Sequence, residues 1–168
     1  RVLNHKGIVH YYEWRVKVFE NSIYASGRDI SDLIMTREKL EYYHNRDALT
    51  GMYQRSFIQS SSEAMVLPYQ LPLSVIFVDL NGLKLINDSY GHDQGDELLR
   101  TISQKMLSYQ REGDIFVRYG GDEFVLLLPY TSYDVASSLA DKIKNSDTLK
   151  ISGRFPSEWV SISLGVAT

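Results

Sequence analysis

Two apolar segments on either side of a glycine pair constrain the fold of this chain more than any other feature. Residues 115–117 (Ile-Phe-Val) precede Arg-Tyr-Gly-Gly-Asp-Glu at 118–123, and residues 124–128 (Phe-Val-Leu-Leu-Leu) follow. This pattern predicts a tight β-hairpin, because glycine adopts positive φ without steric cost. Glycine also lets a ligand approach the backbone, and acids directly after such a turn can hold a divalent cation against phosphate oxygens. Taken alone, the pattern fits a hairpin with two solvated acids equally well.

The segment before Asp79 predicts a second strand. Residues 72–78 (Pro-Leu-Ser-Val-Ile-Phe-Val) form an almost continuous apolar run that ends at Asp79 and Leu80. Such a run is typical of a strand buried on both faces, and ligands in open α/β sheets bind beyond the carboxyl ends of strands. If this strand lies antiparallel beside the hairpin, Asp79 and the hairpin acids can share a metal ion. Mg2+ uses one or two protein carboxylates and completes its octahedron with phosphate oxygens and water.

Glycines divide the next segment into two predicted helices. Apolar residues at helical spacing over 83–89 end near Gly91, and a second amphipathic helix follows over about 94–109. Asn87 and Asp96 flank the break, where both side chains could face a cleft. An aspartate can accept hydrogen bonds from guanine N1–H and its 2-amino group together, which adenine cannot offer. The alternative is structural, with Asn87 as a helix cap and Asp96 as a first-turn acid.

These segments resemble the GGDEF domain of diguanylate cyclases in their residues, order and spacing. The resemblance rests on residues 118–124, on residues 77–96, on Asp-Ala-Leu-Thr-Gly at 47–51 and on the late strand at 161–167, and it runs from about residue 47 to residue 168. It implies an α/β (α+β) fold of the nucleotidyl-cyclase or palm type, with a central antiparallel-mixed sheet flanked by helices. It also implies the condensation of two GTP molecules into cyclic di-GMP.

The expected elements of this domain follow from the periodicity of the apolar residues. Helices are expected at about 52–66, 83–89, 94–109 and 133–146, and strands at about 73–80, 114–118, 123–128 and 159–167. The hairpin and the strand that ends at Asp79 are expected at the centre of the sheet.

The resemblance implies roles for individual residues. Mg2+ (or Mn2+) would be held by Asp79, the backbone carbonyl of Leu80, Asp122 and Glu123. The implied catalytic residues are Asp122, as the proton acceptor for the attacking 3′-hydroxyl, and Glu123, as a support for the metal pair. Strand alternation places these two acids on opposite faces unless the turn twists, so equal roles are not expected. The implied substrate-binding residues are Lys84, Asn87, His92, Asp96, Gly120 and Gly121.

Arg111-Glu112-Gly113-Asp114 stands where the family has its inhibitory product site. Arg111 could stack on a guanine or bind a phosphate of cyclic di-GMP through its planar guanidinium, and Asp114 could read a guanine edge. As a bare pattern, Arg-x-x-Asp is usually a solvated loop. The resemblance favours product feedback inhibition at Arg111 and Asp114.

The chain also departs from the family pattern. Gln54-Arg55 and Asn81-Gly82 stand where other residues are usual, and the family's final helix, with a phosphate-contacting Lys and Arg, has no counterpart before Thr168. This segment alone is therefore expected to be weakly active. Two alternatives remain: a catalytically inactive GGDEF domain that acts as a GTP or cyclic di-GMP receptor, and a cyclase that uses another nucleotide.

Residues 1–30 read differently from the rest. Apolar alternation over 8–18, a turn at 20–22 and a return strand at 23–26 predict a hairpin, which resembles the C-terminal end of a PAS sensor domain. Residues 31–46 predict a connector helix with Ser31 as its cap. The expected domains are thus a PAS-like fragment at 1–30, a signalling helix at 31–46 and a C-terminally truncated GGDEF domain at 47–168. The helix would align a homodimer in which each protomer holds one GTP.

Composition excludes several other classes. A net charge of −3 over 168 residues and no basic stripe argue against a nucleic-acid partner. There is no cysteine, and no apolar run approaches the ~20 residues of a membrane helix. The expected location is cytoplasmic, with no membrane segment in this stretch, although the full-length protein could carry an anchor upstream.

Overall fold

The computed structural model describes residues 2–3, 9–20, 22–59, 71–145, 156 and 159–168. These residues belong to two compact units, Arg1–His44 and Asn45–Thr168. The second unit contains both segments of the predicted site.

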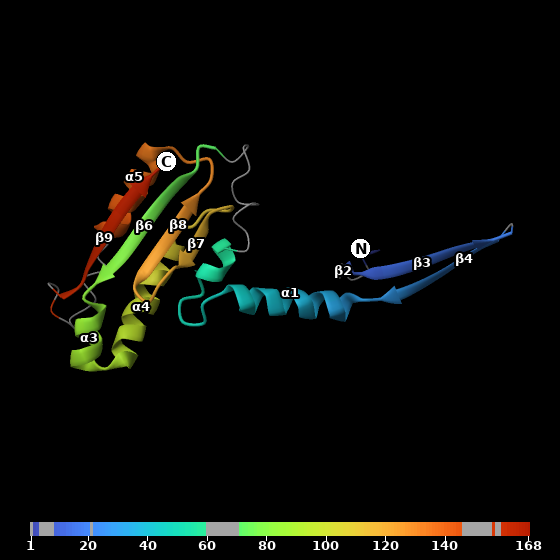
Figure 1. Ribbon diagram of the computed structural model, residues 1–168, viewed down its shortest axis with the longest axis horizontal. Helices are drawn as coiled ribbons and strands as arrows, with labels where there is room; N and C mark the ends of the chain where they lie inside the picture. Colours follow the sequence, from blue (N-terminus) through green and yellow to red (C-terminus); the bar gives the residue numbers. More distant parts are fainter. Residues whose placement is uncertain (1, 4–8, 21, 60–70, 146–155, 157–158) are drawn as a thin grey trace. The chain divides into compact units, whose positions relative to one another are not determined.

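A mixed five-stranded sheet forms the centre of the second unit (Figure 1). Its strands lie in the order β5-β7-β8-β6-β9, so the hairpin β7–β8 and β6 are central, as predicted. Neighbouring strands are antiparallel except for the parallel pair β5–β7. The strands are β5 (Tyr53–Gln54), β6 (Ser74–Asn81), β7 (Ile115–Arg118), β8 (Glu123–Leu128) and β9 (Ser161–Ala167).

Three helices add residues to the core beside the sheet: α3 (Leu83–Tyr90), α4 (His92–Leu107) and α5 (Tyr133–Lys144). Figure 1 shows α4 and α5 behind the sheet, on one of its faces. Their apolar stripes pack against alternate residues of the strands, as expected for amphipathic helices on a sheet. The helix residues of this core are Leu83, Ile86, Leu98, Leu99, Ile102, Met106, Ala136, Ala140 and Ile143.

Strand β6 is buried on one face and partly open on the other. Ile76, Val78 and Leu80 are buried in the core, whereas Phe77 on the opposite face is 44% exposed and Asp79 is half-buried. The prediction of a strand buried on both faces was therefore wrong. In an antiparallel sheet with its core on one face, the other face can meet solvent. This places the Asp79 side chain on the opposite face from the apolar core.

The start of the helix predicted over 52–66 was also wrong. Tyr53 and Gln54 form β5 and pair with Val117 and Arg118, and the helical residues described here are 55–59. The remainder of the predicted helix lies outside the described residues. A two-residue strand carries no periodicity of its own, so only its pairing with β7 reveals it.

The first unit contains a hairpin and a helix. The antiparallel strands β3 (Tyr12–Phe19) and β4 (Ser22–Asp29) lie close to their predicted positions, and β1 (Val2–Leu3) pairs with β2 (Val9–His10). Helix α1 (Ser31–Asn45) follows. The Ser31 hydroxyl accepts from the Tyr11 N–H at 2.9 Å and donates to Asp29, so it does not act as the expected helix cap. In the described part of the chain, no helix is long and apolar enough to span a membrane.

We expect Ser103→Ala to raise the free energy of unfolding by about 1 kcal/mol. Ser103 on α4 is fully buried, and its hydroxyl has no hydrogen-bond partner among the described residues. Such a hydroxyl carries a desolvation cost that a methyl group does not. Ser74→Ala is the matched control, because Ser74 is equally buried but donates to the Thr131 carbonyl at 2.7 Å. Urea unfolding should show a lower free energy of unfolding for Ser74→Ala. Equal decreases in both variants would contradict the inference that the Ser103 hydroxyl destabilises the fold.

Candidate active site

Strand pairing brings the predicted acids to one end of the sheet. In the antiparallel pair β6–β8, Asp79 lies directly opposite Glu123. One step further along the hairpin, the Leu80 N–H donates to the Asp122 carbonyl at 2.9 Å. Residues more than forty positions apart in the sequence thus become neighbours at the carboxyl end of β6.

Asp79 and Glu123 also share a face of the sheet, because directly paired residues point to the same side. That face is the partly open one, where Phe77 precedes Asp79 by two residues. Paired Cβ atoms lie about 4.5–5.5 Å apart, and two like charges in such a position repel each other. A cation bound between the two carboxylates would relieve this repulsion.

The hairpin turn differs from its predicted conformation. Positive φ occurs at Gly51, Gly82, Gly91 and Gly113 but at neither glycine of the turn. A Cβ at Gly120 would lie 2.5 Å from Glu123 Oε2, so a larger residue there would displace the carboxylate of Glu123. The Glu123 side chain therefore lies close to the turn. This contact joins residues three positions apart, so the glycine pair alone did not predict it.

The donor chemistry of this end of the sheet fits a hard divalent cation, with carboxylates of Asp79, Asp122 and Glu123 and the carbonyl of Leu80 available. The side chains are not gathered into a ready-made cage. Among the described residues, no three acidic, histidine or cysteine side chains converge closely enough to hold an ion. This arrangement agrees with magnesium sites, where one or two protein carboxylates suffice and substrate phosphates supply further ligands.

Helices α3 and α4 position the predicted base-contacting residues. The Asn87 Oδ1 atom occupies the space that a Cβ of Gly95 would fill, so the two helices approach closely at this point. The Asn87 backbone carbonyl accepts from the Gly91 N–H at 2.9 Å, which closes the end of α3. Asp96 follows Gly95, is half-buried, and lies 4.0 Å from Arg100 Nη2. Asn87 and the residue before Asp96 are thus in contact.

Lys84 and His92 lie on the same two helices. Both side chains are exposed, Lys84 in the first turn of α3 and His92 at the first residue of α4. Helix α3 begins after Gly82, which has φ +89°. Gly82 directly follows the carboxyl end of β6, where the predicted acids lie. Lys84 is therefore the second residue of a helix whose first N–H groups have no partner within the helix and which begins directly after β6.

Sequence reasoning gave no role to Arg118 and Asp47. Arg118 Nη1 donates to both carboxylate oxygens of Asp47, at 3.1 and 3.3 Å. Partial burial alone would raise the pKa of Asp47, but hydrogen bonds from the Thr50 hydroxyl and N–H and the charge of Arg118 outweigh it, so the pKa lies below its ordinary value. The sequence feature that could have indicated this ion pair was an arginine two residues before the first glycine of the turn.

Arg111 and Asp114 form a closed pair away from these acids. The Asp114 side chain is only 2% exposed and accepts from Arg111 Nη2 at 3.1 Å, Nε at 3.2 Å and the backbone N–H at 2.9 Å. The hydrogen bonds and charge of Asp114 raise the pKa of Arg111. Arg111 Nη2 also donates to Thr131 Oγ1 at 2.7 Å. In this conformation the Asp114 carboxylate is not available to a ligand.

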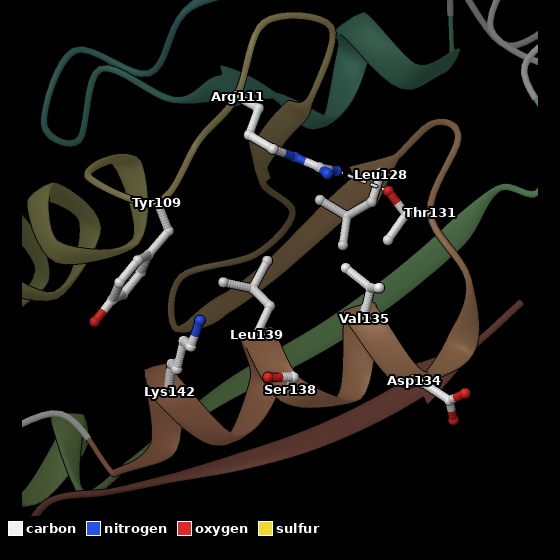
Figure 2. A pocket seen from close by; sticks show the side chains of 9 residues that line it. All are labelled: Tyr109, Arg111, Leu128, Thr131, Asp134, Val135, Ser138, Leu139 and Lys142. Carbon is white, nitrogen blue, oxygen red and sulfur yellow. Dashed lines mark hydrogen bonds between the residues drawn. The ribbon is translucent and has the colours of Figure 1, made fainter.

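A pocket of about 380 Å³ lies next to this pair (Figure 2). Figure 2 shows the Arg111 guanidinium directed toward Thr131 at its edge, with side chains of α5 on the opposite wall. Leu128, Val135 and Leu139 make part of the wall apolar. The pocket combines a planar cation with apolar surface.

Comparison with known proteins places the second unit in a family. Residues 44–168 match the family model described as "Diguanylate cyclase, GGDEF domain". The chain is 39% identical over 145 residues to "Diguanylate cyclase DgcM" of Escherichia coli K12, which covers 83% of this chain and 34% of that protein. It is 32% identical over 144 residues to "Cyclic di-GMP phosphodiesterase PdeR" of the same strain, which covers 85% of this chain and 22% of that protein.

A solved structure shares the fold. The coiled coil and GGDEF domain of DgcB from Caulobacter crescentus, in complex with c-di-GMP, superimposes with a TM-score of 0.69 and 18% sequence identity, over 82% of this chain and 75% of that one. At this identity the likeness concerns the fold alone. The chain spans about a third of the length of DgcM, so the two curated relatives carry much more sequence than is compared.

Proposed function

The chain belongs to the GGDEF domain family of diguanylate cyclases, and from this premise we propose that the full-length protein condenses two GTP molecules into cyclic di-GMP. The observation that carries the proposal is the pairing of Asp79 with Glu123, with Asp122 bonded through its carbonyl to the next residue of β6. All three acids thereby lie at one strand end. The similar protein PdeR is named a cyclic di-GMP phosphodiesterase and not a diguanylate cyclase. The reaction that this protein catalyses therefore needs a direct test.

In this proposal Asp79, the Leu80 carbonyl, Asp122 and Glu123 hold Mg2+ or Mn2+. Bound divalent ions would neutralise the triphosphate and polarise the attacking and leaving oxygens. Asp122 accepts the proton of the 3′-hydroxyl, and Glu123 lies opposite Asp79 on the open face of the sheet. The small residues Gly120 and Gly121 let the triphosphate approach the turn.

The α3–α4 pair supplies the proposed nucleotide contacts. Asp96 accepts from the N1–H and 2-amino group of guanine, and Asn87 contacts the same base. Lys84 and His92 are exposed on these helices and provide groups for the phosphates and the remainder of the substrate. Buried pairing of a carboxylate with guanine would reject adenine, because the adenine N1 acceptor leaves the carboxylate without a donor.

Each protomer is proposed to hold one GTP, so that catalysis takes place in a homodimer. Residues 1–30 are proposed as the end of a PAS-like sensor domain and residues 31–46 as the helix that carries its signal. A change of sensor state then alters the populations of dimer arrangements and does not alter the chemistry.

Product feedback is proposed at Arg111 and Asp114. The guanidinium of Arg111 is half-exposed beside an apolar pocket, which suits a planar base and an anionic phosphate. Since Asp114 is held by Arg111 in this structure, its contact with a guanine edge requires this pair to open.

The direct test is the product formed by the full-length protein. Incubation with equimolar ATP and GTP and Mg2+, followed by mass spectrometry, is expected to give cyclic di-GMP and diphosphate, with no product when the metal is chelated. Tight binding of GTP or cyclic di-GMP without turnover would instead support the receptor alternative. An adenine-containing cyclic dinucleotide would refute the guanine assignment of Asp96.

A further inference from the structure

The Arg118 side chain connects the glycine turn at residues 119–122 to the turn at residues 47–50. Its Nη2 and Nε atoms donate to the Gly121 carbonyl at 2.8 and 3.3 Å, and its Nη1 atom is bonded to Asp47. Both partners of this ion pair are largely withdrawn from solvent, with side-chain exposures of 16% for Arg118 and 24% for Asp47. The fork geometry of a guanidinium is suited to holding two acceptors at once.

Gly121 lies between two residues of the turn that the backbone already anchors. The N–H groups of Tyr119 and Gly120 donate to the Glu123 carbonyl, and the Asp122 carbonyl accepts from Leu80. The residue between these anchors is a glycine with open space around it, and glycine has the largest backbone freedom. Among the described residues, the hydrogen bonds to the Gly121 carbonyl come from Arg118.

Fixing the Gly121 carbonyl also fixes Asp122. The Gly121 C=O and the Asp122 N–H belong to one planar peptide unit, so they turn together. The orientation of this plane sets the direction in which the Asp122 Cα–Cβ bond leaves the backbone. A loose plane would let the Asp122 carboxylate sample several positions without unfolding the hairpin.

Asp47 in turn holds Arg118 in place. Asp47 Oδ1 accepts from the Thr50 N–H at 2.9 Å and from the Thr50 hydroxyl at 2.7 Å. The Asp47 carboxylate is charged at neutral pH, and its bonds to Thr50 and Arg118 hold its pKa below the ordinary value. The same stretch of chain supports the turn twice more, through the pairing of Gln54 with Arg118 and the Arg55 guanidinium 4.5 Å above the Tyr119 ring.

We propose that Arg118 is a positioning residue of the reaction, which orients the Gly121–Asp122 peptide for catalysis and is itself fixed by Asp47. The proposal rests on the proposed cyclase function. It assigns the 47–50 turn a part in setting the catalytic rate, because the turn determines where the guanidinium fork lies.

Arg118→Lys in the full-length protein tests the proposal, since lysine keeps the charge opposite Asp47 but has no fork for the Gly121 carbonyl. We expect kcat to fall about 10²-fold, as for a small misplacement of a catalytic group, with KM for GTP changed by less than about threefold. Independently of activity, the amide NMR signals of Gly121 and Asp122 should broaden or shift, while those of α5 stay in place.

Ser74→Ala is the control for lost stability. It removes a hydrogen bond of a buried side chain at the opposite end of β6 from Asp79, and it leaves the contacts of Arg118 in place. We expect lower thermal stability with near wild-type kcat. An Arg118→Lys enzyme with wild-type kcat, or equal losses of kcat in both variants, would overturn the proposal. If the wild-type protein forms no product, the cyclase function fails, and unchanged Gly121 and Asp122 signals in Arg118→Lys would refute the positioning role separately.

Discussion

Replacing Asp122 by Asn is expected to lower kcat for cyclic di-GMP formation by about 10³-fold or more, the scale on which central catalytic groups act. The amide has nearly the shape of the carboxylate but carries no negative charge and cannot accept the proton of the 3′-hydroxyl. The backbone carbonyl of residue 122, which accepts from Leu80, is retained, so the hairpin should fold normally. Steady-state kinetics with GTP and saturating Mg2+ measure the effect, and thermal unfolding checks the fold.

Asp141→Asn is the control for this experiment. Asp141 is an exposed acid on α5, so its replacement changes the net charge equally without touching the strand end. We expect its kcat to match the wild type. If Asp122→Asn kept more than about a tenth of the activity, a loss below ~1.4 kcal/mol of transition-state stabilisation, Asp122 would not be the proton acceptor, and the proposed mechanism would fail.

Replacing Gly82 by Ala is expected to be the most destabilising of the predicted substitutions, by about 2–5 kcal/mol. Gly82 has φ +89°, where an alanine is strained, and a Cβ at this position would collide with the Trp159 carbonyl oxygen. That oxygen belongs to backbone that leads into β9, so it cannot move aside as a flexible side chain could. Because Gly82 joins β6 to α3, a shift there would also displace Lys84. Urea unfolding and GTP binding measure the two consequences.

Gly113→Ala separates strain from collision. Gly113 has the same φ of +89°, but nothing lies within 4 Å of its added Cβ. The free energy of unfolding of Gly113→Ala should therefore fall only by the cost of an alanine with left-handed backbone angles, about 1–2 kcal/mol. Equal losses at the two positions would show that the close approach of Trp159 does not contribute.

The sequence predicted the elements whose residues repeat with a clear period. Strands β6, β7 and β8 and helices α3, α4 and α5 lie within a few residues of their expected bounds. The position of Asp79 at the carboxyl end of β6 followed from the apolar run before it. The short strand β5 was missed, because Tyr53 and Gln54 become a strand only by pairing with β7.

The candidate site was predictable as a set of residues but not as a geometry. Aspartates and a glutamate after apolar runs indicate metal and phosphate chemistry at the level of residue type. The conformation of Gly120 and Gly121 was expected to depend on positive φ, whereas neither has positive φ in the structure, and a Cβ at Gly120 would instead displace the Glu123 carboxylate. Arg118 received no role because its partners, Asp47 and Gly121, are recognisable only when both are near it.

The sequence by itself determined the family, the order of the main strands and helices, and which acids come at strand ends, because these depend on local periodicity and on residue types at fixed spacing. The tertiary structure alone decided which acids face one another and which side chains support them. Asp79 opposes Glu123 through the register of two strands, and Arg118 reaches Asp47 across 71 positions. Such contacts depend on how segments that are distant in the sequence pack together in space. The local pattern of residues does not specify that packing.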